Sequence, residues 1–174
     1  YAAILALSGK RRTFSARMAS SHNEPPSIMF VCLGNINRSA CAHWVLKRKA
    51  DEADVRVIIA SSGTSSYHVG GPADSEMVKA ASEAGYDMQD HIAAQVHKSD
   101  ADNYDYIIAM DSSNMQDLKR LFPEATHGKL HMFCSFCPEE GITDVPDPYY
   151  EGGHAGVVSL VEKGAQGIID QLLK

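Results

Sequence analysis

SIMFVCLGNINRS, residues 27–39, is the stretch of sequence that decides the fold. Its first six residues form a nearly continuous apolar run, which is typical of a strand buried on both faces of a sheet. A glycine and two asparagines follow, and after Arg38 the apolar residues recur at helical spacing. The stretch therefore predicts a buried strand, a tight loop and a helix in direct succession.

The rest of the chain continues this alternation of strands and helices. We expect helices over residues 39–53, 74–84, 112–122 and 157–173, and further strands over 55–60, 104–110 and 129–134. Residues 61–71 and 141–153 are rich in turn-forming residues and are expected to be loops. This order predicts an α/β fold, a single three-layer domain over residues 27–174 with a four-stranded parallel twisted sheet and helices on both faces.

The loop between the first strand and the first helix carries the residue types of an anion site. Gly34 and Asn35 tolerate positive φ, so the loop can curl with its N–H groups inward at the positive end of the helix. Arg38 adds a planar fork that matches two phosphate oxygens. Cys32 ends the strand, and these positive surroundings, with a hydrogen bond from Ser39, favour its thiolate. We predict a phosphate-binding loop around a nucleophilic cysteine.

Attack by a thiolate on a phosphate ester requires an acid that protonates the leaving oxygen. Asp144 and Asp147 are the candidates, in the segment TDVPDPYY at residues 143–150. Prolines on both sides would hold Asp147 in a stiff loop. Taken alone, the segment is better explained as a plain acidic turn.

Four stretches together resemble the low-molecular-weight protein tyrosine phosphatases. They are VCLGNINRS at 31–39, ASSGTSSYHVG at 60–70, YIIAMDSSN at 106–114 and DPYY at 147–150. The resemblance extends from about residue 27 to the end of the sequence. It implies hydrolysis of phosphotyrosine in proteins, and of small aryl phosphates, without a metal or other cofactor.

The resemblance also implies a role for individual residues. Cys32 would be the nucleophile that forms a phosphocysteine intermediate, Arg38 would stabilise the transition state, and Asp147 would act as general acid and then as base. The other residues that the resemblance implies are phosphate-binding Leu33, Gly34, Asn35, Ile36, Asn37 and Ser39, the aromatic walls Tyr67, Tyr149 and Tyr150, and the supporting residues Ser61 and His91.

Three positions depart from the pattern of this family. Many members have a second cysteine where this chain has Asn37, and that cysteine can form a protective disulfide with the nucleophile. Ala40 replaces a frequent proline, and Ala94 replaces an arginine. We therefore expect the same hydrolysis, less protection of Cys32 against oxidation, and a different choice of partner.

Two other functions stay open from the sequence. An arsenate reductase of the same fold would need further cysteines within reach of Cys32, and the chain offers Cys41, Cys134 and Cys137. A catalytically weak phosphate-binding module would keep the loop and lose turnover. His127 and His131, together with Cys134 and Cys137, also show zinc-ligand types, but a single Cys-x-x-Cys on a predicted strand is a weak signal, and we expect no metal.

Composition sets the remaining expectations. The chain of 174 residues has a formal net charge of −6, and the four basic residues before position 22 leave 12 basic against 22 acidic residues in the rest. A body this acidic argues against nucleic acid as a partner, and no apolar run is long enough to cross a membrane. We expect a monomer in the cytoplasm. Residues 1–26 are expected to be a disordered leader, a transit peptide for organelle targeting, or sequence of non-native origin.

Overall fold

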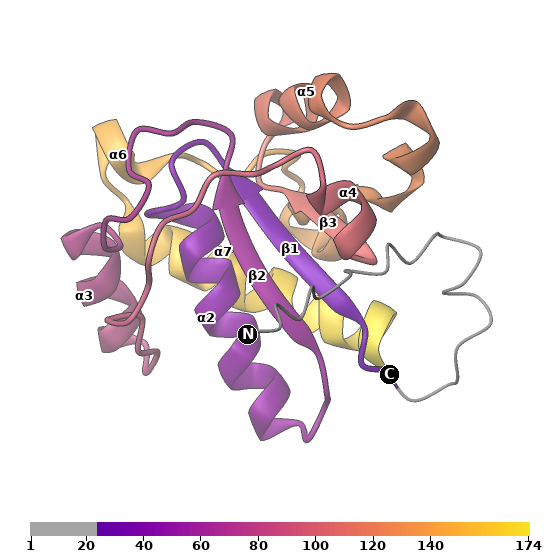
Figure 1. Ribbon diagram of the computed structural model, residues 1–174. Coiled ribbons are helices and arrows are strands. Elements are labelled where there is room, and N and C mark those ends of the chain that lie inside the picture. Colours follow the sequence, from indigo (N-terminus) through magenta and orange to yellow (C-terminus); the bar gives the residue numbers. More distant parts are fainter. Residues whose placement is uncertain (1–23) are drawn as a thin grey trace, which may run out of the picture.

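The computed structural model describes residues 24–174, so nearly all of the leader expected over 1–26 lies outside the described residues (Figure 1). The strands are β1 (Ser27–Cys32), β2 (Ile58–Gly63), β3 (Tyr106–Ala109) and β4 (Leu130–Met132). The longer helices are α2 (Arg38–Glu52), α3 (Ser75–Glu83), α5 (Ser112–Leu121) and α7 (His154–Ile168), and the short helical turns are α4 (Asp100–Asn103), η1 (Glu124–Lys129), η2 (Phe133–Phe136), η3 (Pro138–Glu140), α6 (Pro148–Glu151) and the π-helical η4 (Ile169–Leu173).

The four strands form one parallel sheet in the order β2-β1-β3-β4. β1 is central, and all six of its residues are buried. Its alternate side chains pack into two separate hydrophobic clusters, with Ile28 and Phe30 in one and Met29 and Val31 in the other. The apolar run of β1 is thus explained by a strand that is covered on both faces.

Helices cover both faces of the sheet, which confirms the predicted α/β fold (Figure 1). Buried residues of α2, α3 and α7 belong to the larger cluster, and residues of α4 and α5 belong to the smaller one. α7 packs closely on η2, because a Cβ atom at Gly164 would overlap the ring of Phe133 and one at Gly167 would overlap the carbonyl of Phe136. The absence of side chains at these two glycines lets α7 approach η2.

The bounds of several elements differ from those expected. The second strand begins at Ile58 and not at residue 55, because Asp54 has a φ of 53° and the chain turns back, with Val55 N–H donating to the carbonyl of Ala50. It then continues to Gly63, because these polar and small residues go on pairing with β1. Side-chain composition predicted a loop there, whereas backbone pairing with the central strand keeps the segment extended.

From the sequence, the acidic run around Asp100, Asp102 and Asp105 is most simply a solvated loop, but in the structure this segment is ordered. It contains α4, and Asp105 accepts hydrogen bonds from the backbone and hydroxyl of Ser27 at 2.9 and 2.8 Å. This expectation was wrong, because the carboxylate ties the start of β1 to the segment that leads into β3.

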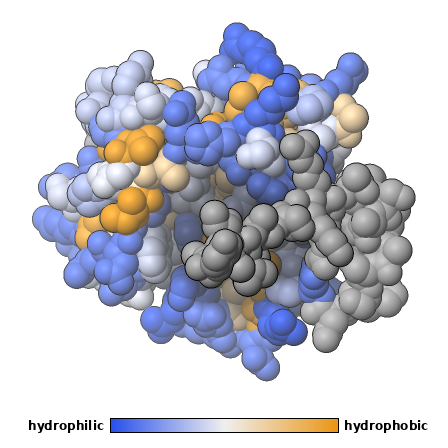
Figure 2. All heavy atoms as spheres, in the orientation of Figure 1, coloured by the Kyte–Doolittle hydropathy of each residue, from blue (hydrophilic) through white to orange (hydrophobic). Residues whose placement is uncertain are grey.

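The surface seen in Figure 2 is mostly hydrophilic, with hydrophobic side chains gathered between α2 and α3. Over residues 24–174, the structure contains no helix that is both long enough and apolar enough to cross a membrane.

Candidate active site

The candidate site lies at the carboxyl end of β1. This strand has β2 on one side and β3 on the other, so the chain leaves the sheet here between two neighbours. Such a switch point opens a crevice above the strand ends. The loop Leu33–Asn37 fills that crevice and leads directly into the first turn of α2.

Asn35 fixes the path of the loop. Its φ of 55° lies in the left-handed region, which asparagine tolerates better than most residues. Its side chain accepts a hydrogen bond from Ala94 N–H and donates one to Ser39 Oγ, both at 2.9 Å. The loop also packs closely on β2, since a Cβ atom at Gly63 would lie 2.6 Å from the carbonyl oxygen of Leu33. The loop is therefore held from both sides.

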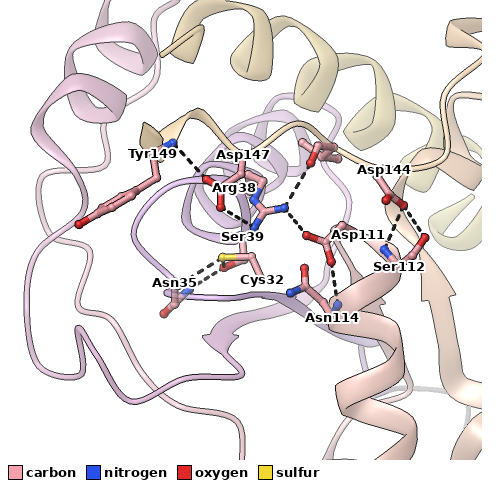
Figure 3. A network of polar contacts seen from close by, with 11 residues as sticks. Cys32, Asn35, Arg38, Ser39, Asp111, Ser112, Asn114, Asp144, Asp147 and Tyr149 are labelled. Carbon is pink, nitrogen blue, oxygen red and sulfur yellow. Dashed lines mark hydrogen bonds and ion pairs between the residues drawn. The ribbon is translucent and has the colours of Figure 1, made fainter. Parts of the chain in front are cut away.

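Two polar groups contact the sulfur of Cys32 (Figure 3). Ser39 Oγ lies 2.9 Å from Sγ, and the backbone N–H of Asn35 donates to Sγ at 3.2 Å. Ser39 Oγ accepts a hydrogen bond from Asn35, and its own proton can be donated to the sulfur at 2.9 Å or to the carbonyl of Ser62 at 3.3 Å. Hydrogen bonds of this kind stabilise a thiolate relative to a thiol.

Arg38 is 3% exposed and is held by two carboxylates. One Nη donates to Asp111 at 2.6 Å and to the carbonyl of Val145 at 3.2 Å, and the other donates to Asp147 at 3.1 Å (Figure 3). Among the contacts of the described residues, these leave the Nε–H and one Nη–H unused. Both of these N–H groups remain able to donate to oxygens of a phosphate.

The structure separates the two candidate acids. Asp147 lines the cavity, faces Arg38, and accepts a hydrogen bond from Tyr149 N–H at the start of α6. Asp144 instead binds the backbone and hydroxyl of Ser112 at 3.0 and 2.7 Å (Figure 3). Of these two carboxylates, Asp147 alone lines the cavity in which a leaving oxygen would lie.

A cavity of about 200 Å³ opens above the loop. Cys32 and Arg38 lie at its base, and Leu33, Tyr67, Tyr149 and Tyr150 are exposed apolar side chains that line it. Tyr149 and Tyr150 pack edge to face, and His68 tilts against Tyr149 with ring centroids 6.1 Å apart. The remaining lining residues are Gly34, Ile36, Asn37 and Asp147. The base of the cavity suits an anion and its mouth suits an aromatic ring.

A second group of polar side chains supports the loop from behind. His91 is buried, and its Nε2 lies 2.7 Å from the carbonyl oxygen of Asn35. The indole N–H of Trp44 donates to Nδ1 of the same ring at 3.2 Å, and His43 stacks on Trp44 and lies 3.1 Å from Ser61 Oγ. Burial lowers the pKa of His91, and burial together with His91 and Lys47 lowers that of His43 to about 4. Both rings are therefore neutral at pH 7.

The comparisons with known proteins agree with this geometry. The family model described as low molecular weight phosphotyrosine protein phosphatase matches residues 27–174. The chain belongs to this family. The low molecular weight phosphotyrosine protein phosphatase of Schizosaccharomyces pombe is 35% identical over 128 residues, covering 72% of this chain and 81% of that protein.

Two solved structures show the same likeness. A protein tyrosine phosphatase from Entamoeba histolytica has a TM-score of 0.80 at 39% identity, covering 84% of this chain and 96% of that one. YfkJ from Bacillus subtilis has a TM-score of 0.84 at 28% identity, covering 87% and 97%. The resemblance seen in the sequence is confirmed, and the family's fold extends through the described domain.

In this member of the phosphatase family, the residues selected from the sequence divide into two sets. Those that line the cavity are Cys32, Leu33, Gly34, Ile36, Asn37, Arg38, Tyr67, Asp147, Tyr149 and Tyr150. Asn35 belongs to the loop but does not line the cavity, and Ser39 and His91 contact Asn35 from behind the loop. Ser61 does not contact the loop through its hydroxyl, which contacts His43 instead. The neighbouring residue Ser62 contacts Ser39, since its backbone carbonyl lies 3.3 Å from Ser39 Oγ.

Sequence reasoning missed several residues that shape the site. Asp111 directly precedes the helix predicted at residues 112–122, so the sequence predicts a helix cap there. Asp111 does cap α5 by accepting from Asn114 N–H, but its other oxygen binds Arg38. Its place directly after a strand, at the edge where the loop lies, was the available signal. Nothing in the local sequence distinguished Trp44 and His43 from ordinary helix residues, because their role depends on His91, 47 residues away from Trp44.

The other cysteines lie away from the cavity. Cys41 is buried in α2, and burial raises the pKa of its thiol to about 12. Cys134 and Cys137 are buried around η2, and burial raises the pKa of both, that of Cys134 to about 11. Within residues 24–174, no group of three or more histidine, cysteine or carboxylate side chains is arranged to hold a metal ion.

Proposed function

We propose that this chain hydrolyses phosphotyrosine in proteins, and small aryl phosphates, through a phosphocysteine intermediate. One observation carries the proposal: Cys32, Arg38 with its two unused N–H groups, and the carboxylate of Asp147 all line the same cavity. The mouth of this cavity is aromatic. A nucleophile, an anion clamp and a proton donor are what two-step phosphoryl transfer requires.

In the first step, the phosphate lies in the loop, and Arg38 and the loop N–H groups bind its non-bridging oxygens. The thiolate of Cys32 attacks phosphorus, a P–S bond forms, and the P–O bond to the phenol breaks. Asp147 gives its proton to the departing phenolic oxygen. The loop donors are already in place, so charge that develops on the phosphoryl oxygens is stabilised without rearrangement.

In the second step, water attacks phosphorus and Asp147 takes up the proton that it loses. The P–S bond breaks, inorganic phosphate leaves, and the sulfur returns as a thiolate held by Ser39 and the Asn35 N–H. The same carboxyl group thus serves first as acid and then as base, and it ends each cycle protonated.

The shape of the cavity supports an aryl ester as substrate. Tyr67 and Tyr150 are 80% and 84% exposed, and Tyr149 is half-exposed, so aromatic surface stands above the loop. A phenyl ring can pack against these rings while its phosphate reaches Cys32. The shorter side chain of phosphoserine would have to bring the peptide backbone down among the tyrosines.

The test is hydrolysis of 4-nitrophenyl phosphate and phenyl phosphate across pH by wild type, Cys32→Ser and Asp147→Asn. We expect Cys32→Ser to abolish turnover and still bind inorganic phosphate. Asp147→Asn should lower kcat by about 10²–10³-fold. The loss should be greater for phenyl phosphate, because phenol is the poorer leaving group and depends more on protonation. Turnover by both variants at the wild-type rate would refute the mechanism.

The two other functions considered from the sequence predict different results. A binding module would bind phosphate without turnover in the wild type. An arsenate reductase would relay oxidation to a second cysteine, yet Cys41, Cys134 and Cys137 are buried and none lines the cavity. Release of phosphate from an aryl ester without any thiol reductant would count against both.

A further inference from the structure

Trp44 lies on the second turn of α2, half-buried, behind the loop and not in the cavity. Its indole N–H donates to His91 Nδ1 at 3.2 Å, and the other ring nitrogen of His91 lies 2.7 Å from the carbonyl oxygen of Asn35. Three residues from separate segments thus form one chain of hydrogen bonds that ends at the loop.

The direction of this chain follows from the chemistry of its groups. An indole nitrogen can only donate, and a carbonyl oxygen can only accept. Nδ1 of His91 must therefore be the acceptor and Nε2 must carry the hydrogen. In the other neutral tautomer, two N–H groups would face each other at Trp44 and two lone pairs would face each other at Asn35. The donor on α2 and the carbonyl of Asn35 thus select the same tautomer of His91.

Protonation of His91 would disturb the same contact. A proton on Nδ1 would face the indole N–H, and burial already lowers the pKa of His91. His43 faces it edge-on from α2, with ring centroids 6.3 Å apart. The charged groups around the outer side of Trp44 are of both signs, with Lys47, Arg48 and Asp51 on α2 and Asp87 and Asp90 on the segment that leads to His91. The neutral ring is the state that fits these surroundings.

The carbonyl of Asn35 matters because Asn35 holds the loop in its strained conformation. Among the described residues, only Asn35 and Asp54 have positive φ without being glycine. The backbone N–H of Asn35 contacts the sulfur of Cys32, and its side chain contacts Ser39. A change in the hydrogen bond to its carbonyl would therefore be felt at both groups that contact the sulfur.

We propose that Trp44 is a positioning residue for the phosphate-binding loop, which holds His91 in the neutral Nε2–H tautomer so that His91 donates to the carbonyl of Asn35. This inference rests on the proposed function for its effect on turnover. The tautomer and the affinity for inorganic phosphate can be measured without turnover.

The experiment compares wild type with Trp44→Phe, which keeps a packed ring and removes the N–H. Long-range ¹H–¹⁵N spectra at pH 7 report which imidazole nitrogen carries the proton, and His91→Gln assigns the signal of His91. We expect the Nε2–H tautomer in the wild type and a mixture of tautomers in Trp44→Phe. The affinity for inorganic phosphate should fall about fivefold in Trp44→Phe, as expected for one weakened hydrogen bond.

The matched control is Tyr86→Phe, which removes the donor of a 2.7 Å hydrogen bond to Glu162 of α7. It should leave both the His91 signal and phosphate affinity unchanged. The deficit of Trp44→Phe should also shrink once the pH is low enough to protonate His91, because a doubly protonated His91 again donates to Asn35 whichever tautomer it held.

If Trp44→Phe fails to fold, the wild-type spectrum still tests whether His91 is in the neutral Nε2–H tautomer. An Nδ1–H tautomer or a cationic His91 at pH 7 would overturn the proposal. So would a folded Trp44→Phe with an unchanged His91 signal and unchanged phosphate affinity. Absence of phosphatase turnover in the wild type would refute the proposed function and leave this inference standing.

Discussion

Asn37 is the residue at which this loop departs most from the family pattern. It lines the cavity and is 4% exposed, and its side-chain oxygen has no hydrogen-bond partner among the described residues. A buried polar atom without a partner lowers stability, and an amide cannot form a disulfide. Compared with a cysteine at this position, the amide therefore offers no protective disulfide, and its oxygen accepts no hydrogen bond in exchange.

We predict that Asn37→Cys protects the enzyme from peroxide. Peroxide converts the Cys32 thiolate to a sulfenic acid, which condenses with a neighbouring thiol to a disulfide and water, and dithiothreitol reduces that disulfide. In the wild type the sulfenic acid proceeds to irreversible sulfinic acid. Activity recovered after matched peroxide doses and reductant should be several-fold higher in Asn37→Cys. Equal recovery in the two proteins would refute the prediction.

A second prediction at this scale concerns the carboxylate that holds Arg38. Asparagine caps helices about as well as aspartate, so Asp111→Asn should keep the unfolding free energy within about 1 kcal/mol of wild type. The neutral amide holds the guanidinium less strongly, and KM for an aryl phosphate should rise about threefold. Urea unfolding and steady-state kinetics measure the two effects. A loss of stability with unchanged kinetics would show that Asp111 acts only as a cap.

Among the elements, α7 depends most on small residues. Gly167 faces the carbonyl of Phe136, and a Cβ atom there would overlap backbone that cannot move aside easily. Gly156 lies on the same helix and has open space around it. We predict that Gly167→Ala lowers the unfolding free energy by about 3 kcal/mol, and that Gly156→Ala raises it by about 0.5–1 kcal/mol through its effect on helix propensity. Similar effects of both substitutions in urea unfolding would contradict the close packing of Gly167 on Phe136.

His43 of α2 contacts Ser61 of β2, and the burial of this histidine predicts that the fold is less stable at acid pH. The pKa of His43 in the folded chain is about 4, against 6.5 for a free imidazole, so the unfolded chain binds more protons between these values. Stability contributed by the neutral ring is thus fully present above about pH 6.5 and is lost as the pH falls toward 4. We expect this loss to be about 2 kcal/mol. His43→Phe, which keeps the stacking on Trp44, should flatten this part of the stability curve.

The control for that measurement is His97→Gln, which changes an exposed histidine and should leave the curve as in wild type. An identical slope in wild type and His43→Phe would show that another group titrates with folding in this range.

At the scale of the whole molecule, charge predicts which peptides are dephosphorylated fastest. The chain has a formal net charge of −6, and Arg38 is the only arginine or lysine among the described residues that line the cavity. Phosphotyrosine peptides with flanking lysines should therefore have a higher kcat/KM than matched peptides with flanking glutamates, by about tenfold at low salt. The ratio should shrink in 0.5 M NaCl. A ratio that does not respond to salt would locate the preference in direct contacts.

The sequence predicted the fold well because the decisive signals are local. The buried run of β1 and the residues of the Cys32–Arg38 loop occupy one short segment, and the helices follow from their periodicity. The predictions were wrong where pairing with a distant strand decides the local structure, as in the extension of β2 along β1. The roles of Trp44 and His43 could not be seen, since each depends on a partner brought near only by the folded sheet. For the second role of Asp111, the sequence offered only its place directly after a strand.

Arg38 is neutralised by carboxylates that lie 73 and 109 residues later in the chain. During synthesis, the cysteine and the arginine leave the ribosome long before either partner exists. A nascent chain therefore has a potential nucleophile but no acid and no fixed clamp. Because these parts meet only when the last segments dock, catalytic competence should arrive late in folding, and the first turnover would mark a nearly complete domain.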